Sequence, residues 1–421
     1  MSKRRYTSKK FKQVDWKTVT DRLVGSRVIL AVDVAKEDFY AAIMNERHEA
    51  LVIFSWRHPE QTAEVVDQLR QLRQAHRLEA VLEPSGTYGD VLVWQLRQAQ
   101  IPVYRVSPKR VHDAAEVYDG VPSLHDAKAA SLIGRLHLEG ISQPWQEQTE
   151  KRRTLKAVTT QLGLCKAREQ AVCNRLEAQL SRHWPELPYL LDLGSVTLAA
   201  LIGAYGDPAS VAADPAGAVA LMRRVGRSGL GEEKIQAILD SARHSLGVPM
   251  VDSERSFVQW LGNEASAIHR EVRQIEQKIM QRVGQDSELS GQARAIGKVS
   301  AGVILAATGS AIDYPTTSSY IKAMGLNLKE RSSGKHKGQL KITKRGPSVV
   351  RYYLYFAALR LIAHDPVVRQ WYEVKSSRPG AIKNKCVIEL MRKLAKALWH
   401  IARGESFDSN KLFNLKAVAA A

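Results

Sequence analysis

Short apolar runs and helical repeats alternate through the first third of the chain. Residues 27–56 carry three such runs, RVILAVDVA, FYAAIM and ALVIFSW, separated by a few polar residues. Runs of this length, rich in β-branched and apolar residues, predict adjacent strands joined by tight turns. A helical pattern follows over 60–76, then a strand ending at LEPSG, a helix over 90–100, the short strand IPVYRVSP and a helix from 125 to 140. This order predicts an α/β domain built on one mixed sheet of the RNase H kind.

The remainder of the chain has helical patterns. Two long helices are predicted over about 148–190 and 253–284, separated by a Gly-, Ala- and Pro-punctuated helical insert (190–250) to which the sequence assigns no role. The long helices suit an antiparallel pair, a contact between subunits or a plain spacer. Further on, IGKVSAGVILAATG predicts a turn that opens an apolar helix, as helix-hairpin-helix elements have.

These patterns predict five segments. They are a flexible basic arm (1–26), an α/β domain (27–147), a helical or coiled-coil-like linker with the insert (148–290), a mainly helical C-terminal domain (291–408) and a tail (409–421).

Charge narrows the range of partners. The chain has 421 residues, with 62 Lys and Arg against 43 Asp and Glu, for a formal net charge of +19. Such an excess favours a polyanionic partner, nucleic acid before an acidic membrane surface. The three cysteines form no CxxC pair, and no apolar stretch approaches the ~18 residues of a membrane span. The basic start has no apolar run after it, so we expect a cytoplasmic protein.

Three carboxylates stand at positions where a metal site would use them. Asp33 ends the first apolar run, Glu83 ends a later one, and Asp126 opens a helix. Each has an ordinary alternative: Asp33 as a turn cap, Glu83 as an ion-pair partner and Asp126 as a helix cap. Together they would be able to hold two Mg²⁺ ions about 3.5–4 Å apart, the arrangement that activates phosphodiester attack.

The segments around these carboxylates, AVDVAKEDF, LEPSGTY and PSLHDAKAASLIGRL, resemble the motif blocks of the insertion sequence 110 family of transposases. That family has a DEDD, RuvC-like catalytic domain and is related to the Piv invertase. The blocks IGKVSAGVILAATG, KAMGLNLKERSSGKHKG and TKRGPSVVRYYLY resemble its second domain. The resemblance covers roughly 27–140 and 290–405. It implies that Asp33, Glu83 and Asp126 are catalytic metal ligands.

One acidic position of the family is vacant in this chain. The fourth carboxylate falls three residues after Asp126, one helical turn along, where the chain has Ala129. A less fitting register moves Asp126 to the fourth position and leaves Ser123 at the third. Three interpretations stay open. Asp119 or His125 fills the gap in a natural variant, the loss of one carboxylate weakens the metal site, or Ala129 is an engineered inactivation.

The resemblance places the family's nucleophilic serine on Ser333, beside Ser332, in the segment ERSSGKHKG. Without the resemblance, this segment is a solvated loop. Its dense positive charge favours phosphate contacts, with a plain basic surface as the alternative. The expected nucleic-acid-binding residues are Lys329, Arg331, Lys335, Lys337, Lys341, Lys344 and Arg345. Of the tyrosines that follow (Tyr352, Tyr353 and Tyr355), we expect most in the core and one free to stack on a base.

The sequence therefore predicts a transposase or recombinase that cuts and rejoins DNA through the carboxylates and the C-terminal serine. The resemblance implies a structured bridge RNA that selects donor and target DNA, and recombination of four strands suggests a dimer or tetramer. Two alternatives stay open. One is a RuvC-like nuclease or resolvase in which water attacks; the other is a catalytically silent nucleic-acid-binding protein.

Overall fold

The computed structural model describes residues 6–23, 27–330, 338 and 340–413, apart from the side chains of residues 287 and 288. The chain divides into two compact units, Met1–Glu147 and Gln148–Ala421, which are described separately. No helix among the described residues is long and apolar enough to span a membrane.

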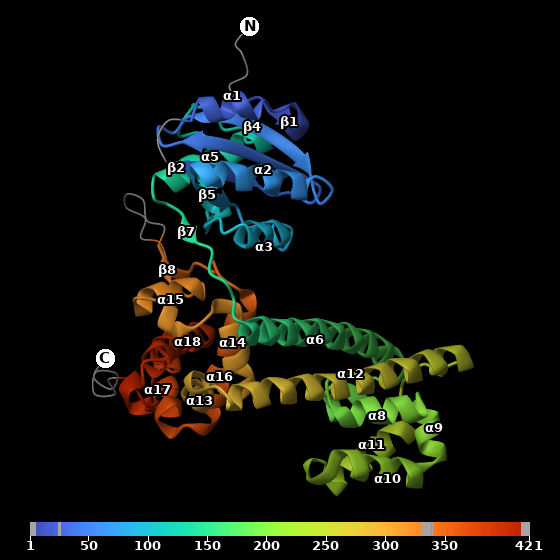
Figure 1. Cartoon of the computed structure of the whole chain (residues 1–421). Helices are drawn as coiled ribbons and strands as arrows, with labels where there is room; N and C mark the ends of the chain where they lie inside the picture. The colour runs from blue at the N-terminus through green and yellow to red at the C-terminus, as the bar shows by residue number, and fades with distance from the viewer. Residues whose placement is uncertain (1–5, 24–26, 331–337, 339, 414–421) are drawn as a thin grey trace. The chain divides into compact units, whose positions relative to one another are not determined.

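The first unit is an α/β domain on a seven-stranded mixed sheet, ordered β1-β4-β3-β2-β5-β6-β7 (Figure 1). β3 runs antiparallel to β2 and β4, whereas β5 is parallel to both β2 and β6. This arrangement is consistent with the predicted RNase H-like domain. The strands are β1 (Lys9–Lys10), β2 (Arg27–Asp33), β3 (Asp38–Asn45), β4 (Ala50–Arg57), β5 (Arg77–Leu82), β6 (Val103–Arg105) and β7 (Gln143–Pro144); the α-helices are α1 (Trp16–Asp21), α2 (Thr62–Ala75), α3 (Asp90–Gln98), α4 (Pro108–Asp113) and α5 (Asp126–Leu138).

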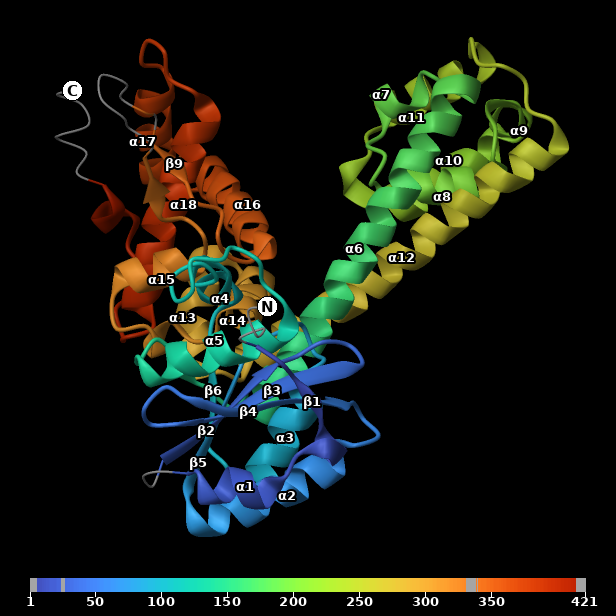
Figure 2. The same ribbon diagram turned by 90° about the horizontal axis from the view of Figure 1, so that it is seen from above.

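Both faces of this sheet are covered (Figure 2). Val28, Leu30 and Val32 of β2 belong to a core shared with α2 and α3, while Ile29 and Ala31 belong to a second core with α5. Successive side chains of a strand point to opposite faces, which explains why β2 is an almost continuous apolar run. The predicted run of strands over 27–56 is the β2-β3-β4 meander.

The expectation of a flexible arm over residues 1–26 is wrong for most of that segment. β1 pairs in parallel with β4, with Lys9 opposite Phe54. Phe11 and Val19 are buried against the sheet core at 8% and 5% exposure. Apolar side chains spaced among the lysines therefore anchor the segment, because their burial offsets the entropy lost on ordering it.

An ion-pair network lies inside the first unit, around the Glu79 carboxylate. Glu79 is 1% exposed, and its oxygens lie 2.8 Å from Arg27, 3.1 Å from Arg77 and 3.0 Å from the ring of His137. Burial alone would raise the pKa of Glu79, but hydrogen bonds from Arg27 and His137 outweigh it and hold that pKa below its ordinary value. Burial likewise lowers the pKa of His137. Glu79 therefore ties β2, β5 and α5 together.

Replacing Glu79 by glutamine should destabilise the first unit by about 3 kcal/mol, because Arg27 would lose its partner beside a buried histidine. Both depressed pKa values mean that these two groups bind more protons in the unfolded chain, so the stability that this network contributes should also fall as the pH drops below about 6.5. Urea denaturation at pH 7 and pH 5 measures both effects. Glu64→Gln, at an exposed pair with Lys12, is the control and should change stability by less than ~1 kcal/mol. An equal loss in the two variants would contradict the structural role of Glu79.

The second unit is almost entirely helical. Its elements are α6 (Glu150–His183), α7 (Leu187–Leu190), α8 (Val196–Tyr205), α9 (Pro208–Ala213), α10 (Pro215–Gly226), α11 (Glu232–Arg243), α12 (Asp252–Gly284), α13 (Ser287–Ile296), α14 (Lys298–Thr308), α15 (Thr317–Ala323), β8 (Leu328–Lys329), β9 (Lys341–Ile342), α16 (Ser348–His364), α17 (Pro366–Ser376) and α18 (Lys383–Ile401).

The two long helices, α6 and α12, pack along each other within the chain (Figure 1). Arg168 pairs with Glu264 at 2.8 Å and Arg182 with Glu254 at 3.4 Å, so the helices run antiparallel. The insert between them folds as helices α7–α11 around a core of its own, which includes residues of both long helices. It is a packed helical lobe and not a loop.

The C-terminal part of the second unit begins with α13 and α14, joined at Gly297, where φ is 87°. Glycine takes this left-handed conformation without steric cost, which fits the predicted turn. The expectation of a loose tail from residue 409 is wrong for its first residues. Phe413 is 7% exposed and stacks on Trp371 with ring centroids 4.6 Å apart, which packs residues 409–413 against α17.

Candidate active site

The three predicted carboxylates lie at one end of the first unit. Asp33 is the last residue of β2, Glu83 follows β5 directly, and Asp126 is the first residue of α5. The amide N–H of Glu83 donates to the Val32 carbonyl at 3.4 Å, which joins the two strand ends. Because β2 and β5 are parallel neighbours, their carboxyl ends meet at the same edge of the sheet.

Strand alternation and the direction of α5 bring Asp126 to this same edge. Asp33 follows Ile29 and Ala31 at two-residue spacing, so it faces the α5 side of the sheet. Gly134 of α5 lies so close to β2 and β3 that an added Cβ would meet Ala31 at 3.0 Å and the Met44 sulfur. Further along α5, the contacts are with the first residues of β2. The helix therefore runs antiparallel to β2, with its first turn at the Asp33 end.

The carboxylates are close enough to repel one another. Burial, followed by the negative charge of Asp126, raises the pKa of Asp33 to about 6. Burial and the charge of Asp33 also raise the pKa of Glu83. Tyr40, opposite Asp33 in β3, has a raised pKa through burial and then the charge of Asp126. Asp33 is therefore the centre of a cluster of negative charge with Glu83 on one side and Asp126 on the other.

This cluster has the oxygen donors that Mg²⁺ prefers, and a cation would relieve its repulsion. Within the described residues, however, no group of three or more His, Cys, Asp or Glu is arranged closely enough to hold a metal ion by itself. The structure thus brings the three predicted residues close enough for their charges to act on one another, but it does not arrange their oxygens around a common metal position.

The vacant position, Ala129, lies one turn along α5 from Asp126. Its side chain is 4% exposed and belongs to the core between α5 and the sheet. Asp119, which the sequence offered as a substitute ligand, accepts hydrogen bonds from Lys128 Nζ at 2.9 Å and from the Val121 N–H at 3.0 Å. Lys128 is 2% exposed, so recruiting Asp119 to a metal would strip a buried ammonium of its counter-ion.

His125, the other substitute, is exposed at the N-cap position of α5. Its ring meets that of Tyr6 edge to face, with centroids 6.1 Å apart.

Introducing aspartate at Ala129 tests whether this position faces the cluster. Without metal, Ala129→Asp should lower the free energy of unfolding by about 2 kcal/mol or more, because a buried carboxylate joins like charges. Saturating Mg²⁺ should recover most of that loss and raise activity. Ala130→Asp, buried one residue along, is the control, and Mg²⁺ should not rescue it. Equal behaviour of the two variants would show that Ala129 does not face the cluster.

Ser333, its neighbour Ser332 and three of the predicted basic residues (Arg331, Lys335 and Lys337) lie outside the described residues. The structure does describe the two stretches that flank this segment, 325–330 and 340–346, which we call its legs. β8 and β9 pair as antiparallel strands, with Lys329 opposite Lys341. Next to this strand pair, the Thr343 N–H donates to the Asn327 carbonyl at 2.8 Å, so the residues before and after the segment lie side by side.

The base of these legs is tightly packed. Gly325 has a φ of 69°, and an added Cβ there would meet the backbone nitrogens of Arg345 and Gly346 at 3.0 Å. Lys344 donates its N–H to the Gly325 carbonyl at 3.0 Å. The described basic residues therefore stand on a fixed base at the start and end of the predicted serine segment.

The three tyrosines after this segment lie on α16. Tyr352 is 53% exposed, whereas Tyr353 and Tyr355 are half-buried against the core of the second unit. Phe356, one turn from Tyr352, is 50% exposed, and the two rings lie 4.7 Å apart. An exposed aromatic pair beside a basic segment is suited to stacking on bases.

Sequence reasoning missed a second exposed aromatic surface, next to the carboxylates. Tyr88 and Trp94 at α3 are 50% and 53% exposed. Between them, Gly89 packs close to Val34 and Leu82, the neighbours of Asp33 and Glu83 in the chain. The available signal was that Tyr88, Val91 and Trp94 follow one another at three-residue spacing, starting from the last residue of LEPSGTY.

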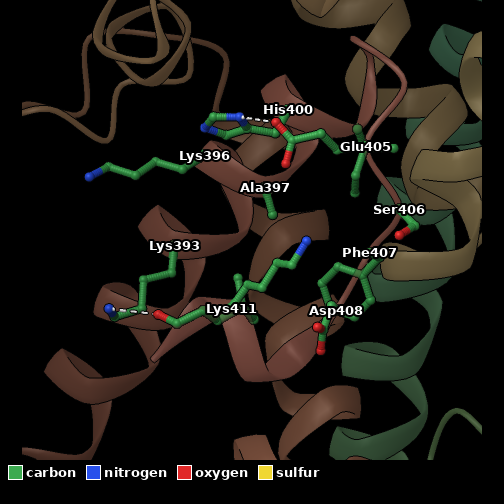
Figure 3. A pocket seen from close by; sticks show the side chains of 11 residues that line it. Lys393, Lys396, Ala397, His400, Glu405, Ser406, Phe407, Asp408 and Lys411 are labelled. Atoms are coloured by element: carbon green, nitrogen blue, oxygen red, sulfur yellow. Dashed lines mark hydrogen bonds and ion pairs between the residues drawn. The ribbon is translucent and has the colours of Figure 1, made fainter. Parts of the chain in front are cut away.

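A cavity of about 390 Å³ lies in the second unit, beside the C-terminal half of α18 (Figure 3). Lys393, Lys396 and Lys411 line it together with Glu405. Lys393 donates to the Leu412 carbonyl at 3.0 Å, and burial lowers the pKa of its ammonium group. None of the predicted catalytic residues lines this cavity.

A mixed sheet with carboxylates gathered at its strand ends, in a strongly basic chain, is an arrangement suited to proteins that act on nucleic-acid phosphodiesters. Residues 30–185 match a family model for the DEDD transposase of the IS110 type, and residues 291–373 match the family described as transposase IS116/IS110/IS902. Together the two regions cover more than half of the chain. The chain therefore belongs to the IS110 family of transposases, which implies DNA strand transfer. A search of curated proteins found no match.

Proposed function

We propose that this transposase of an insertion sequence cuts and rejoins DNA through a Mg²⁺-dependent, RuvC-like carboxylate site in the first unit and Ser333 in the second. The observation that carries the proposal is the burial of the Asp33 carboxylate next to the negative charge of Asp126, at the end of β2 beside the end of β5. A half-buried carboxylate with a pKa of about 6, beside two further acids, stores an electrostatic cost that a bound cation would remove.

Asp33, Glu83 and Asp126 are the residues that would hold Mg²⁺. When bound, Mg²⁺ supplies positive charge that stabilises the phosphate as negative charge builds up during the reaction. The residues themselves orient that charge: β2 and β5 fix two carboxylates from the sheet, and α5 brings the third over it. Ala129 leaves the site one carboxylate short of the family pattern, so we expect weaker metal binding than a fourth acid would give.

Ser333 is the proposed nucleophile. Its Oγ attacks a DNA phosphorus, forming an Oγ–P bond as the bond from phosphorus to the 3′ oxygen breaks. The serine proton leaves Oγ, and the departing 3′ oxygen gains a proton. The product is a 5′-phosphoserine link plus a free 3′-hydroxyl. A second 3′-hydroxyl reverses these steps with a new partner strand, so the energy of the broken bond is kept for rejoining.

The basic legs around Ser333 are proposed to hold the DNA backbone. Lys329, Lys341, Lys344 and Arg345 stand on the fixed base described above, and charge of this density favours phosphate contacts. Family membership also leads us to propose a bridge RNA, encoded by the same element, as the guide that selects donor and target DNA, and a homodimer or homotetramer as the active assembly.

Strand transfer between labelled donor and target DNA, with the element's non-coding RNA and Mg²⁺, tests this proposal. Joined product should require all components, and EDTA or prior digestion of the RNA should remove it. Joining that persists without RNA would contradict the guide role. Cleavage without joining would favour a nuclease that uses water, and binding without cleavage would favour a silent nucleic-acid-binding protein.

A further inference from the structure

A groove of about 700 Å³ lies in the first unit, at the β4 edge of the sheet, between the N-terminal segment and α5. The N-terminal segment, the start of β4 and α5 form its walls. Its polar lining comes mainly from Tyr6, Lys9, Arg22, Arg47, Ser131 and Arg135. None of the three candidate metal ligands lines the groove, so it is separate from the carboxylate cluster.

The charge available to a ligand in this groove is positive. Four cationic side chains line it, against the carboxylates of Asp15 and Glu49. Both acids are engaged within their own turns. Asp15 accepts hydrogen bonds from the backbone N–H and the hydroxyl of Thr18, and Glu49 accepts one from the Asn45 amide at 2.8 Å. The cations are spread along the walls, which suits a chain of phosphates better than a single one.

Tyr6 adds a hydrogen-bonding group without a protein partner. Its hydroxyl is buried, and among the described residues nothing bonds to it. A buried polar group left without a partner costs roughly 1–3 kcal/mol. A ligand oxygen in the groove would satisfy the hydroxyl, which gives a reason for keeping a tyrosine where phenylalanine would pack equally well.

The groove also lies along the helix that begins at the carboxylates. Ser131 and Arg135 belong to α5, whose first residue is Asp126. At about 1.5 Å per residue, Arg135 lies roughly 13 Å along the helix from Asp126. That span equals about four base pairs of duplex at 3.4 Å each. A strand whose phosphodiester lies at the carboxylates would therefore be within reach of the groove.

We propose that this groove binds the phosphodiester backbone of a nucleic acid, with Arg47, Arg135 and Lys9 as phosphate contacts and the Tyr6 hydroxyl as a donor. This inference rests on the proposed function in one respect, namely that the partner of the chain is a nucleic acid. The same chemistry would recognise substrate DNA or an RNA guide, and binding of a DNA probe and of an RNA probe distinguishes the two.

The test uses the full chain without Mg²⁺, so neither Ser333 nor the carboxylate site affects the readout. Binding of a labelled duplex DNA and of a labelled RNA hairpin is measured by fluorescence anisotropy over a range of salt concentrations. The double variant Arg47→Ala/Arg135→Ala should lower the slope of log K against log salt by about 2 for the bound probe. Arg70→Ala/Arg73→Ala on α2, at the opposite face, removes the same charge and should leave the slope nearly unchanged.

A change with DNA alone assigns the groove to DNA, and a change with RNA alone assigns it to RNA. Equal changes in the two double variants, or none in either, would overturn the proposal. Because Arg135 also lies over the Tyr118 ring, Arg47→Ala alone serves as a second variant, with an expected slope change of about 1.

Tyr6→Phe gives an independent readout. It removes only the hydroxyl, so the free protein should be at least as stable as the wild type, while affinity for the probe should fall several-fold. Tyr189→Phe, at a side chain that is 92% exposed in the second unit, should change neither quantity. Unchanged affinity of Tyr6→Phe would remove the hydroxyl from the proposed site.

Discussion

Ser333→Ala is expected to abolish joining of donor to target DNA, with a fall in strand-transfer rate of about 10³-fold or more. Without Oγ there is no atom to form the phosphoserine link, and water does not store bond energy for a second exchange. Gel analysis of the products under single-turnover conditions measures the loss. Binding of DNA should remain close to wild type, because the charges on the flanking legs are untouched.

Ser332→Ala is the matched control, since it removes the same atoms one residue away in the same basic segment. We expect it to retain most of the joining activity. If Ser333→Ala still cleaves at the wild-type rate and leaves 5′-phosphate ends, water is the nucleophile and the protein is a nuclease. If Ser332→Ala is the inactive variant, the assignment of the nucleophile moves by one residue.

The second large effect is expected at Asp33. Asp33→Asn should slow strand transfer by about 10²-fold or more, because a neutral amide holds Mg²⁺ weakly and several kcal/mol of charge stabilisation are lost. The same variant should stabilise the metal-free protein. The pKa of Asp33 is raised to about 6 in the folded state, first by burial and then by Asp126, so its ionisation opposes folding.

The pH dependence follows from the direction of that shift. The folded protein binds the Asp33 proton more tightly than the unfolded chain does, so the contribution of Asp33 to stability falls as the pH rises from about 4 through 6. Above pH 6 the full cost applies, roughly 1–2 kcal/mol once partial exposure of the side chain is allowed for. Metal-free Asp33→Asn should exceed the wild type by this amount at pH 7.5, and the gap should close near pH 4.

Mg²⁺ should raise the thermal midpoint of the wild type and leave that of Asp33→Asn nearly unchanged. Asp21→Asn, at an exposed position on α1, should match the wild type at every pH and with Mg²⁺. Equal stabilisation of wild type and Asp33→Asn by Mg²⁺ would place the metal elsewhere.

The sheet and the longest helices follow from periodicity alone. The run RVILAVD has an apolar residue at every position between Arg27 and Asp33, as expected of a strand covered on both faces, and β2 is covered by α2 and α3 on one side and α5 on the other. The position of Asp33 and Glu83 at the ends of such runs was enough to place them at one sheet edge. These features depend on local pattern, which a single sequence carries.

Other features depend on contacts between distant residues. Glu79 lies in β5, and the acid predicted to bind metal, Glu83, follows the end of that strand. Only the structure separates their roles: Glu79 pairs with Arg27 and His137, whereas the charge of Asp33 acts on Glu83. The ordering of the N-terminal segment likewise depends on β4, more than 40 residues away. Its signal was present in apolar residues such as Phe11 among the lysines, but the basic composition concealed it.

The engagement of Asp119 is a further contact that the sequence did not reveal. Its ion pair with Lys128 joins a loop to a residue two positions after Asp126. Because Asp119 is paired with Lys128, alanine at position 129 leaves the metal with fewer carboxylates than the family pattern provides. We therefore expect this transposase to need more Mg²⁺ for half-maximal activity than its own Ala129→Asp variant does.

The most direct test of the account is to identify the atom that joins protein to DNA. The wild-type protein is incubated with Mg²⁺, its element's RNA and labelled DNA, denatured during the reaction, and digested for mass spectrometry of the peptide that retains a nucleotide. The serine mechanism predicts a phosphodiester on Ser333, absent without Mg²⁺ and from Asp33→Asn. Complete cleavage of the DNA with no nucleotide on any peptide would contradict it.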